Sequence, residues 1–126
     1  MKLKKTTEDY LKTIYILNKK DGVRGVEIAE VMNVSRPSVS VALKALKQEG
    51  YVWIIEHRHV FLTDLGLSVA SETYEKNRFF RNLLLELGID EETATHDACD
   101  LEHSISTESF LAIRSALAHR KDEKDY

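Results

Sequence analysis

Residues 26–50, VEIAEVMNVSRPSVSVALKALKQEG, decide the fold of this chain. Apolar side chains recur at helical spacing on both sides of a short turn at 33–35, which predicts two helices joined tightly. Ser35 can cap the second helix, and Pro37 is tolerated in its first turn because no helical hydrogen bond is lost there. This order is typical of a helix-turn-helix, whose second helix crosses the major groove of DNA.

The segment before this pair predicts another helix. A capping box that starts at Thr6 and ends at Asp9 is followed by apolar residues at helical spacing. The pattern predicts a helix over about 7–20, which the turn-forming pair Asp21-Gly22 would end.

The segment after the pair predicts a β-hairpin. Two apolar runs, 52–55 and 60–62, flank the polar tip at 56–59. Three helices followed by a hairpin have the order of a winged helix-turn-helix, so we place a DNA-binding domain at residues 1–63.

The second half predicts a helical domain over residues 64–126. Its helices are expected from Thr63 toward Gly88, from an Asp90 cap to about 103, and from a Ser106 cap to about 119. The fold class is therefore mainly α with a short β-hairpin wing: a winged helix-turn-helix domain followed by a helical dimerisation domain. Apolar residues crowd the fourth and sixth of the predicted helices, which favours pairing of two copies, although a core within one copy would also use them.

Polar and basic residues mark the side of the third helix that would meet DNA. The first half of the chain, residues 1–60, carries a net charge of +4 and the second half −7, so phosphate contacts belong to the first half. Arginine can fork onto a guanine edge or a phosphate, and serine hydroxyls can bind either. The alternative to DNA binding is that these polar residues form only the solvent-exposed face of a helix in a bundle. The predicted DNA-binding residues are Ser35, Arg36, Pro37, Ser38, Ser40, Lys44 and, at the hairpin tip, Arg58.

A second group of residues has the chemistry of metal ligands. Cys99, Glu102 and His103 stand in the i, i+3, i+4 relation, so their side chains are neighbours on one side of a helix. Each has an ordinary alternative: Cys99 can be a small buried apolar residue, and the other two can pair with neighbours on the helix face. Asp9 can simply be the last residue of the capping box.

The motifs together resemble the diphtheria toxin repressor family, which contains iron- and manganese-dependent repressors. The likeness covers about residues 6–118 and implies a homodimer, with an N-terminal winged helix and a C-terminal helical lobe. The chain stops before the SH3-like third domain of the longer members, so it resembles the short form. The segments that carry the likeness are Thr6–Tyr15, Ile28–Val39, Leu62–Gly66 and Cys99–His103.

The resemblance implies a metal site made by Asp9, Cys99, Glu102 and His103. Aspartate at position 9 matches the manganese branch, whereas cysteine at position 99 matches the iron branch. Positions that serve a second ion in the family depart from its pattern, which implies about one ion per subunit. These departures are Asn77, Arg81 and Lys12. His96 precedes Cys99 by three residues and could add a nitrogen ligand.

The donor set restricts the metal to divalent transition ions. Fe(II) and Mn(II) are the first choices, and Zn(II), Co(II) and Ni(II) also suit a set of thiolate, imidazole and carboxylates. Magnesium and calcium prefer oxygen ligands alone. Asp9 belongs to the first domain and the other ligands to the second, so an ion bound by all four would couple the two lobes.

The expected function is a metal-responsive repressor of metal-uptake genes that binds operator DNA. The alternative is a winged-helix regulator that senses a small ligand, or an oxidant through Cys99, the only cysteine. An enzyme is not expected, because no nucleophile–base pair and no phosphate-binding loop occur. We expect no small-molecule substrate. We also expect no membrane segment, and a cytoplasmic location because a lone cysteine suits a reducing compartment.

Overall fold

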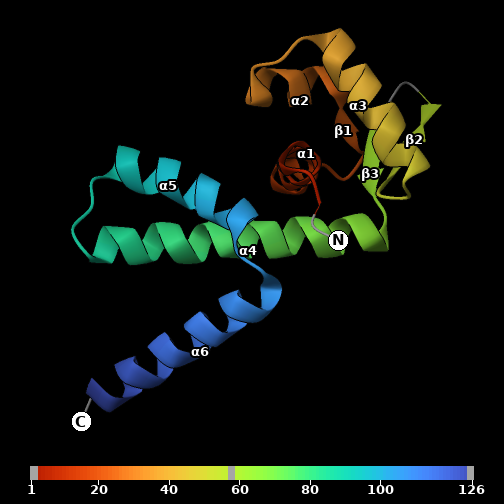
Figure 1. The fold of residues 1–126 in the computed structure, drawn as a ribbon. Helices are drawn as coiled ribbons and strands as arrows, with labels where there is room; N and C mark the ends of the chain where they lie inside the picture. Colours follow the sequence, from red (N-terminus) through yellow and green to blue (C-terminus); the bar gives the residue numbers. More distant parts are fainter. Residues whose placement is uncertain (1–2, 57–58, 125–126) are drawn as a thin grey trace. The chain divides into compact units, whose positions relative to one another are not determined.

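The computed structural model describes residues 3–56 and 59–124 of the 126-residue chain. Helices dominate the described residues, with three short strands in the first half. The chain divides into two compact units, Met1–Thr73 and Tyr74–Tyr126, and the boundary falls inside the longest helix. Along the chain (Figure 1) the elements are α1 (Lys5–Leu17), β1 (Val23–Arg24), α2 (Gly25–Met32), α3 (Arg36–Gln48), β2 (Val52–Ile55), β3 (His59–Leu62), α4 (Asp64–Glu86), α5 (Glu91–Ser104) and α6 (Thr107–Lys124).

The helix-turn-helix is confirmed and forms as the sequence predicts. Asn33 ends α2 in the left-handed conformation, with φ of 55°, which asparagine tolerates better than most residues. The Ser35 hydroxyl accepts the backbone N–H of Ser38 at 3.2 Å and so caps α3. Pro37 lies in the first turn of α3, where it displaces no hydrogen bond.

The predicted hairpin is confirmed, and a third strand joins it. β2 and β3 pair antiparallel, with Val52 opposite Leu62. The two-residue strand β1 adds to the other side of β3, with Val23 opposite Val60, so the strand order is β1-β3-β2. The sequence did not predict β1, because a two-residue strand has no periodicity and its pairing depends on residues far along the chain.

The limits of α1 differ from the prediction at both ends. The helix begins at Lys5 behind an N-cap at Lys4 that makes no side-chain hydrogen bond, so the predicted capping box at Thr6 is wrong. The helix ends at Leu17 rather than near 20, because Asn18 adopts the left-handed conformation and its N–H bonds to the carbonyl of Ile14.

The core of the first unit joins α1, α2, α3 and the sheet. Each helix contributes the apolar face that its spacing predicts, and each strand contributes the residue on its inner face. The largest of the fully buried side chains here belong to Leu11, Ile28, Val23, Val39 and Val60. This core fixes the position of α3 while leaving the opposite side of that helix exposed.

The second unit contains the end of α4 together with α5 and α6. α5 runs back along α4: Arg81 reaches Glu91 near the start of α5 at 3.1 Å, and the Lys76 ammonium donates to the carbonyl of Ile105 just after its end at 3.0 Å. Asp90 caps α5 as predicted by accepting the N–H of Thr93. Hydrogen bonds from the Thr93 hydroxyl and N–H hold the pKa of Asp90 below its usual value.

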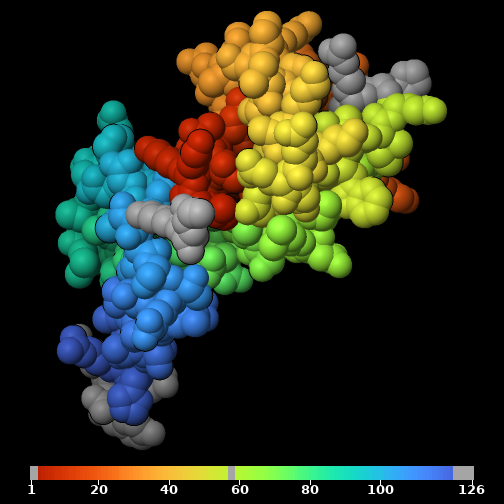
Figure 2. Space-filling view, turned by 45° about the vertical axis from the view of Figure 1, so that its right-hand side comes forward, coloured from red at the N-terminus to blue at the C-terminus, as the bar shows by residue number. Residues whose placement is uncertain are grey.

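Aromatic rings join α4 to α6. Phe79 contacts Phe80 and Phe110 edge to face, with ring centroids 5.2 and 5.5 Å apart. α6 continues to Lys124, about five residues beyond the predicted end at 119, and its second half protrudes from the rest of its unit (Figures 1 and 2). Residues 120–124 contain no glycine or proline that would end the helix.

Candidate nucleic-acid interface and metal centre

The predicted DNA-binding residues of the first unit share the exposed side of α3 and its cap. Val39, Leu43 and Leu46 face the core, and the polar side chains between them face solvent. The exposed residues are Ser35, Arg36, Pro37, Ser38, Ser40 and Lys44. Arg58, the remaining predicted contact, lies outside the described residues. Ser35 also donates to the Ser38 hydroxyl at 2.8 Å, so its first role in the described structure is to cap the helix.

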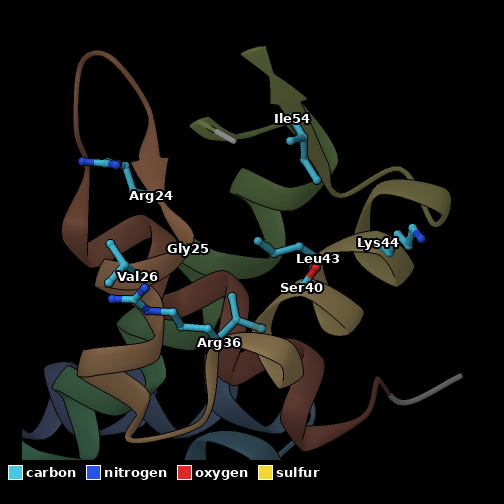
Figure 3. A pocket seen from close by; sticks show the side chains of 9 residues that line it. Arg24, Gly25, Val26, Arg36, Ser40, Leu43, Lys44 and Ile54 are labelled. Carbon is cyan, nitrogen blue, oxygen red and sulfur yellow. The ribbon is translucent and has the colours of Figure 1, made fainter. Parts of the chain in front are cut away.

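A hollow of about 360 Å³ lies beside this surface, between the start of α2, α3 and β2. Its apolar lining includes Val39 and Leu43. In Figure 3, Arg24 and Arg36 stand on one side of the hollow and Lys44 on the other. Three cations around one concave surface attract anions such as phosphate. Arg24 was missed by the sequence analysis because it belongs to the unpredicted strand β1.

In the second unit, Glu102 and His103 form a buried pair on α5. Their side chains are 0% and 7% exposed, and His103 Nε2 lies 3.8 Å from Glu102 Oε2. Burying a carboxylate costs free energy unless an opposite charge or a metal ion compensates it. The half-buried Cys99 precedes Glu102 by three residues, so all three donors come from the same region of α5. Sulfur, oxygen and nitrogen donors together fit a divalent transition metal.

Asn77 of α4 contacts this group. Its side-chain nitrogen lies 3.0 Å from Glu102 Oε1 and 3.7 Å from Cys99 Sγ. The sequence analysis had identified Asn77 only as a departure from the family pattern. Arg81, a second departure, lies one turn further along α4 and bonds to Glu91 and to the Thr95 hydroxyl instead.

Two further residues were predicted as ligands, Asp9 on α1 and His96 on α5. Asp9 is half-buried on α1 of the first unit, and its backbone carbonyl accepts the Thr13 hydroxyl at 2.8 Å. The interpretation of Asp9 as part of a capping box is wrong, since Thr6 does not cap α1. His96 is on the exposed side of α5, with a side chain 77% exposed and Nδ1 3.6 Å from Asp97.

The comparisons with known proteins match both halves of the chain. Residues 2–60 match the family described as "Iron dependent repressor, N-terminal DNA binding domain". Residues 63–125 match the family described as "Iron dependent repressor, metal binding and dimerisation domain". Within the described residues, no helix has the length and apolar character that a membrane crossing requires.

Relatives with similar sequences are transcriptional regulators. An uncharacterized HTH-type transcriptional regulator of Methanocaldococcus jannaschii is 31% identical over 96% of this chain and 99% of its own length. The transcriptional regulator MntR of Escherichia coli O157:H7 is 38% identical over 85% of this chain and 70% of its own.

Solved structures agree with the fold. The manganese regulator SloR superposes with a TM-score of 0.77 and 33% identity, and ScaR with bound Zn²⁺ with a TM-score of 0.74 and 34% identity. Each alignment covers 89% of this chain but 53% of the solved chain, so this chain spans about half the length of those proteins.

Proposed function

The chain belongs to the iron-dependent repressor family of metal-dependent transcriptional regulators, and from this membership we propose that it represses metal-uptake genes when Fe(II) or Mn(II) is bound. The observation that carries the proposal is the buried Glu102–His103 pair, which lies beside Cys99 in the half that matches a metal-binding domain. The alternative, sensing of a small ligand or an oxidant through Cys99, finds no support among the relatives.

We propose one metal ion per subunit, bound by Asp9, Cys99, Glu102 and His103. Thiolate and imidazole favour Fe(II), Co(II), Ni(II) or Zn(II), and two carboxylates also admit Mn(II). The half-buried position of Asp9 is compatible with a role as a ligand. His96 is not included, because its exposed side chain lies beside Asp97 and Asp100.

The proposed ligands explain how metal binding would control DNA binding. Asp9 belongs to the domain with α3, and the other three ligands belong to the second domain. Sharing one ion would restrict the two domains to one arrangement, and in a dimer this would fix the separation of the two α3 helices. The half-sites that a dimer reads on DNA are spaced by about 34 Å or a multiple of it. The metal-bound form would select the domain arrangement in which the two α3 helices match this spacing. Linkage makes this coupling reciprocal: the factor by which metal raises the affinity for operator DNA is also the factor by which operator DNA raises the affinity for metal.

We propose that the exposed side of α3 lies in the major groove, with Arg36 and Lys44 as its cationic contacts. Arg36 can reach a guanine edge or a phosphate, whereas lysine acts as a point charge toward phosphate. Arg24, at the start of α2 on the same hollow, adds a third cation for the backbone. The predicted contact by Arg58 remains part of this proposal.

The test is an anaerobic calorimetric titration of the apoprotein with Fe(II), Mn(II) and Zn(II), followed by DNA-binding measurements with each loaded form. We expect one strong site per subunit and DNA binding that rises when metal is added. The operator fragment is selected from random duplexes with the loaded protein. Two strong sites per subunit would contradict the proposed stoichiometry. A DNA affinity that is the same with and without metal would contradict the proposed function.

We also propose that the protein is a homodimer. Its second half matches a dimerisation domain, and large apolar side chains of that half remain exposed in the single chain: Leu87, Leu111 and Ile113. Phe79, Leu83 and Leu117 line a groove between α4 and α6 that a second copy could cover. An obligate dimer would bury this surface.

Sedimentation velocity should give a mass of about 29 kDa, twice the 14.5 kDa of one chain. Leu111→Glu should shift the population toward monomer, because a carboxylate would be buried in the interface. Ser109→Glu adds the same charge two residues earlier, on the other side of α6, and should remain dimeric. A monomeric wild type would contradict the proposal.

The remaining parts of the proposal concern location and chemistry. A DNA-binding repressor works where the chromosome is, so we place the protein in the cytoplasm. We propose no enzymatic activity and no small-molecule substrate, since the relatives are transcriptional regulators.

A further inference from the structure

We propose that Asn77 determines the metal preference of this centre by holding Glu102 to ligation through one oxygen. The inference rests on the proposed function, because it assumes that Glu102 is a ligand. Asn77 lies on α4 and reaches across to α5, where its side-chain nitrogen contacts Glu102 Oε1 at 3.0 Å and Cys99 Sγ at 3.7 Å. All three residues belong to the same unit, Tyr74–Tyr126.

The direction of these contacts follows from the chemistry of the amide. Glutamate oxygens and a thiolate are acceptors, and the amide nitrogen carries two N–H donors. Turning the amide around would place its carbonyl oxygen against a carboxylate, which repels it. Asn77 therefore presents hydrogen-bond donors, and not a ligand atom, to both neighbours.

The two carboxylate oxygens of Glu102 have different neighbours. Oε1 accepts the Asn77 N–H, whereas Oε2 lies 3.8 Å from His103 Nε2. An ion bound beside His103 would therefore meet Oε2 first. Ligation through both oxygens would make the ion share Oε1 with the Asn77 N–H, and a carboxylate oxygen that already accepts a hydrogen bond is the weaker donor to a metal.

Ligation through one oxygen lowers the number of donors around the ion. Low coordination with a thiolate and an imidazole suits Co(II), Zn(II) and Fe(II), whereas Mn(II) prefers a larger, oxygen-rich shell. The N–H contact to Cys99 also stabilises the thiolate that these metals prefer. Asn77 thus favours iron-like ions over Mn(II) at a site whose other residues admit both.

The experiment compares Asn77→Leu and Asn77→Asp with the control Arg81→Leu. Leucine has a similar size but no donor, and aspartate replaces the donor with oxygen. Arg81 also joins α4 to α5, but it bonds to Glu91 and Thr95 and not to the proposed metal ligands. The measurements are the Co(II) absorption spectrum, which reports coordination number and sulfur ligation, and titrations with Co(II) and Mn(II). Circular dichroism of each apoprotein shows whether it folds.

We expect both Asn77 variants to lose about 10- to 100-fold in Co(II) affinity, the usual effect of removing a residue that orients a ligand. Mn(II) affinity should fall less or rise, and the Co(II) d–d bands should weaken as coordination expands. The control should resemble wild type. Equal losses for both metals with an unchanged spectrum would overturn the proposal, as would unchanged affinities. If the wild type binds neither ion, the proposed function fails, and this inference fails with it.

Discussion

His103→Ala is expected to abolish metal-stimulated DNA binding while the protein remains folded. His103 supplies the only imidazole among the proposed ligands, and loss of a ligand itself should weaken metal binding by more than the ~10- to 100-fold that loss of a ligand-orienting residue costs. Because α5 keeps its Asp90 cap and its neighbours on α4, the helix itself should persist. Removing the buried ring leaves a cavity that should cost about 1–3 kcal/mol of stability.

The measurement is a DNA-binding titration with and without Mn(II) or Fe(II), with circular dichroism as the check on folding. His96→Ala is the matched control, since His96 lies on the same helix but is exposed. The control should bind metal and DNA as the wild type does. Metal-dependent DNA binding that survives in His103→Ala would show that the ion is bound elsewhere.

Gly66→Ala should strongly destabilise the first unit. A Cβ atom at this position would meet the carbonyl oxygen of Tyr51, and backbone there has little freedom to move. The Tyr51 carbonyl already accepts the N–H of Thr63, whose hydroxyl donates to the Gly50 carbonyl at 2.6 Å and accepts the N–H of Gly66. We expect the free energy of unfolding to fall by about 3 kcal/mol or more, as for other overpacked buried sites.

Urea denaturation of both proteins measures this difference. Gly25→Ala is the control, because its added Cβ would lie 3.7 Å from Val39, an ordinary contact, at the start of α2. That change should be neutral or stabilise the protein by up to about 1 kcal/mol. If Gly66→Ala unfolds at the same urea concentration as the wild type, α4 does not approach Tyr51 as closely as described.

The sequence predicted those features whose causes are local. Ser35 and Asp90 cap their helices because each hydroxyl or carboxylate bonds to an N–H three residues away, and a short window of sequence contains both partners. The apolar run at 52–55, followed by the polar tip at 56–59, likewise contains the information for a strand. The end of α1 was missed because Asn18 can continue a helix or end it, and the choice depends on packing.

Features that depend on distant parts of the chain could not be predicted in the same way. β1 exists because Val23 pairs with Val60, and no pattern in the sequence near either residue indicates this pairing. The side-chain chemistry and helical spacing of Glu102 and His103 predicted them as candidate metal ligands. Their burial could not be predicted, because it depends on the packing around α5. The role of Asn77 required its distances to Glu102 and Cys99, which only the folded unit provides.

The short strand β1 has a consequence for how this domain can change in evolution. Arg24 is both the last residue of β1 and the N-cap of α2, so no loop separates the sheet from the helix-turn-helix. A residue inserted after Arg24 would shift either the pairing with His59 or the start of α2. Lengthening the turn at 18–21 would disturb neither. Changes in chain length between α1 and α2 should therefore accumulate in that turn, and the spacing from Val23 to Ser35 should remain constant.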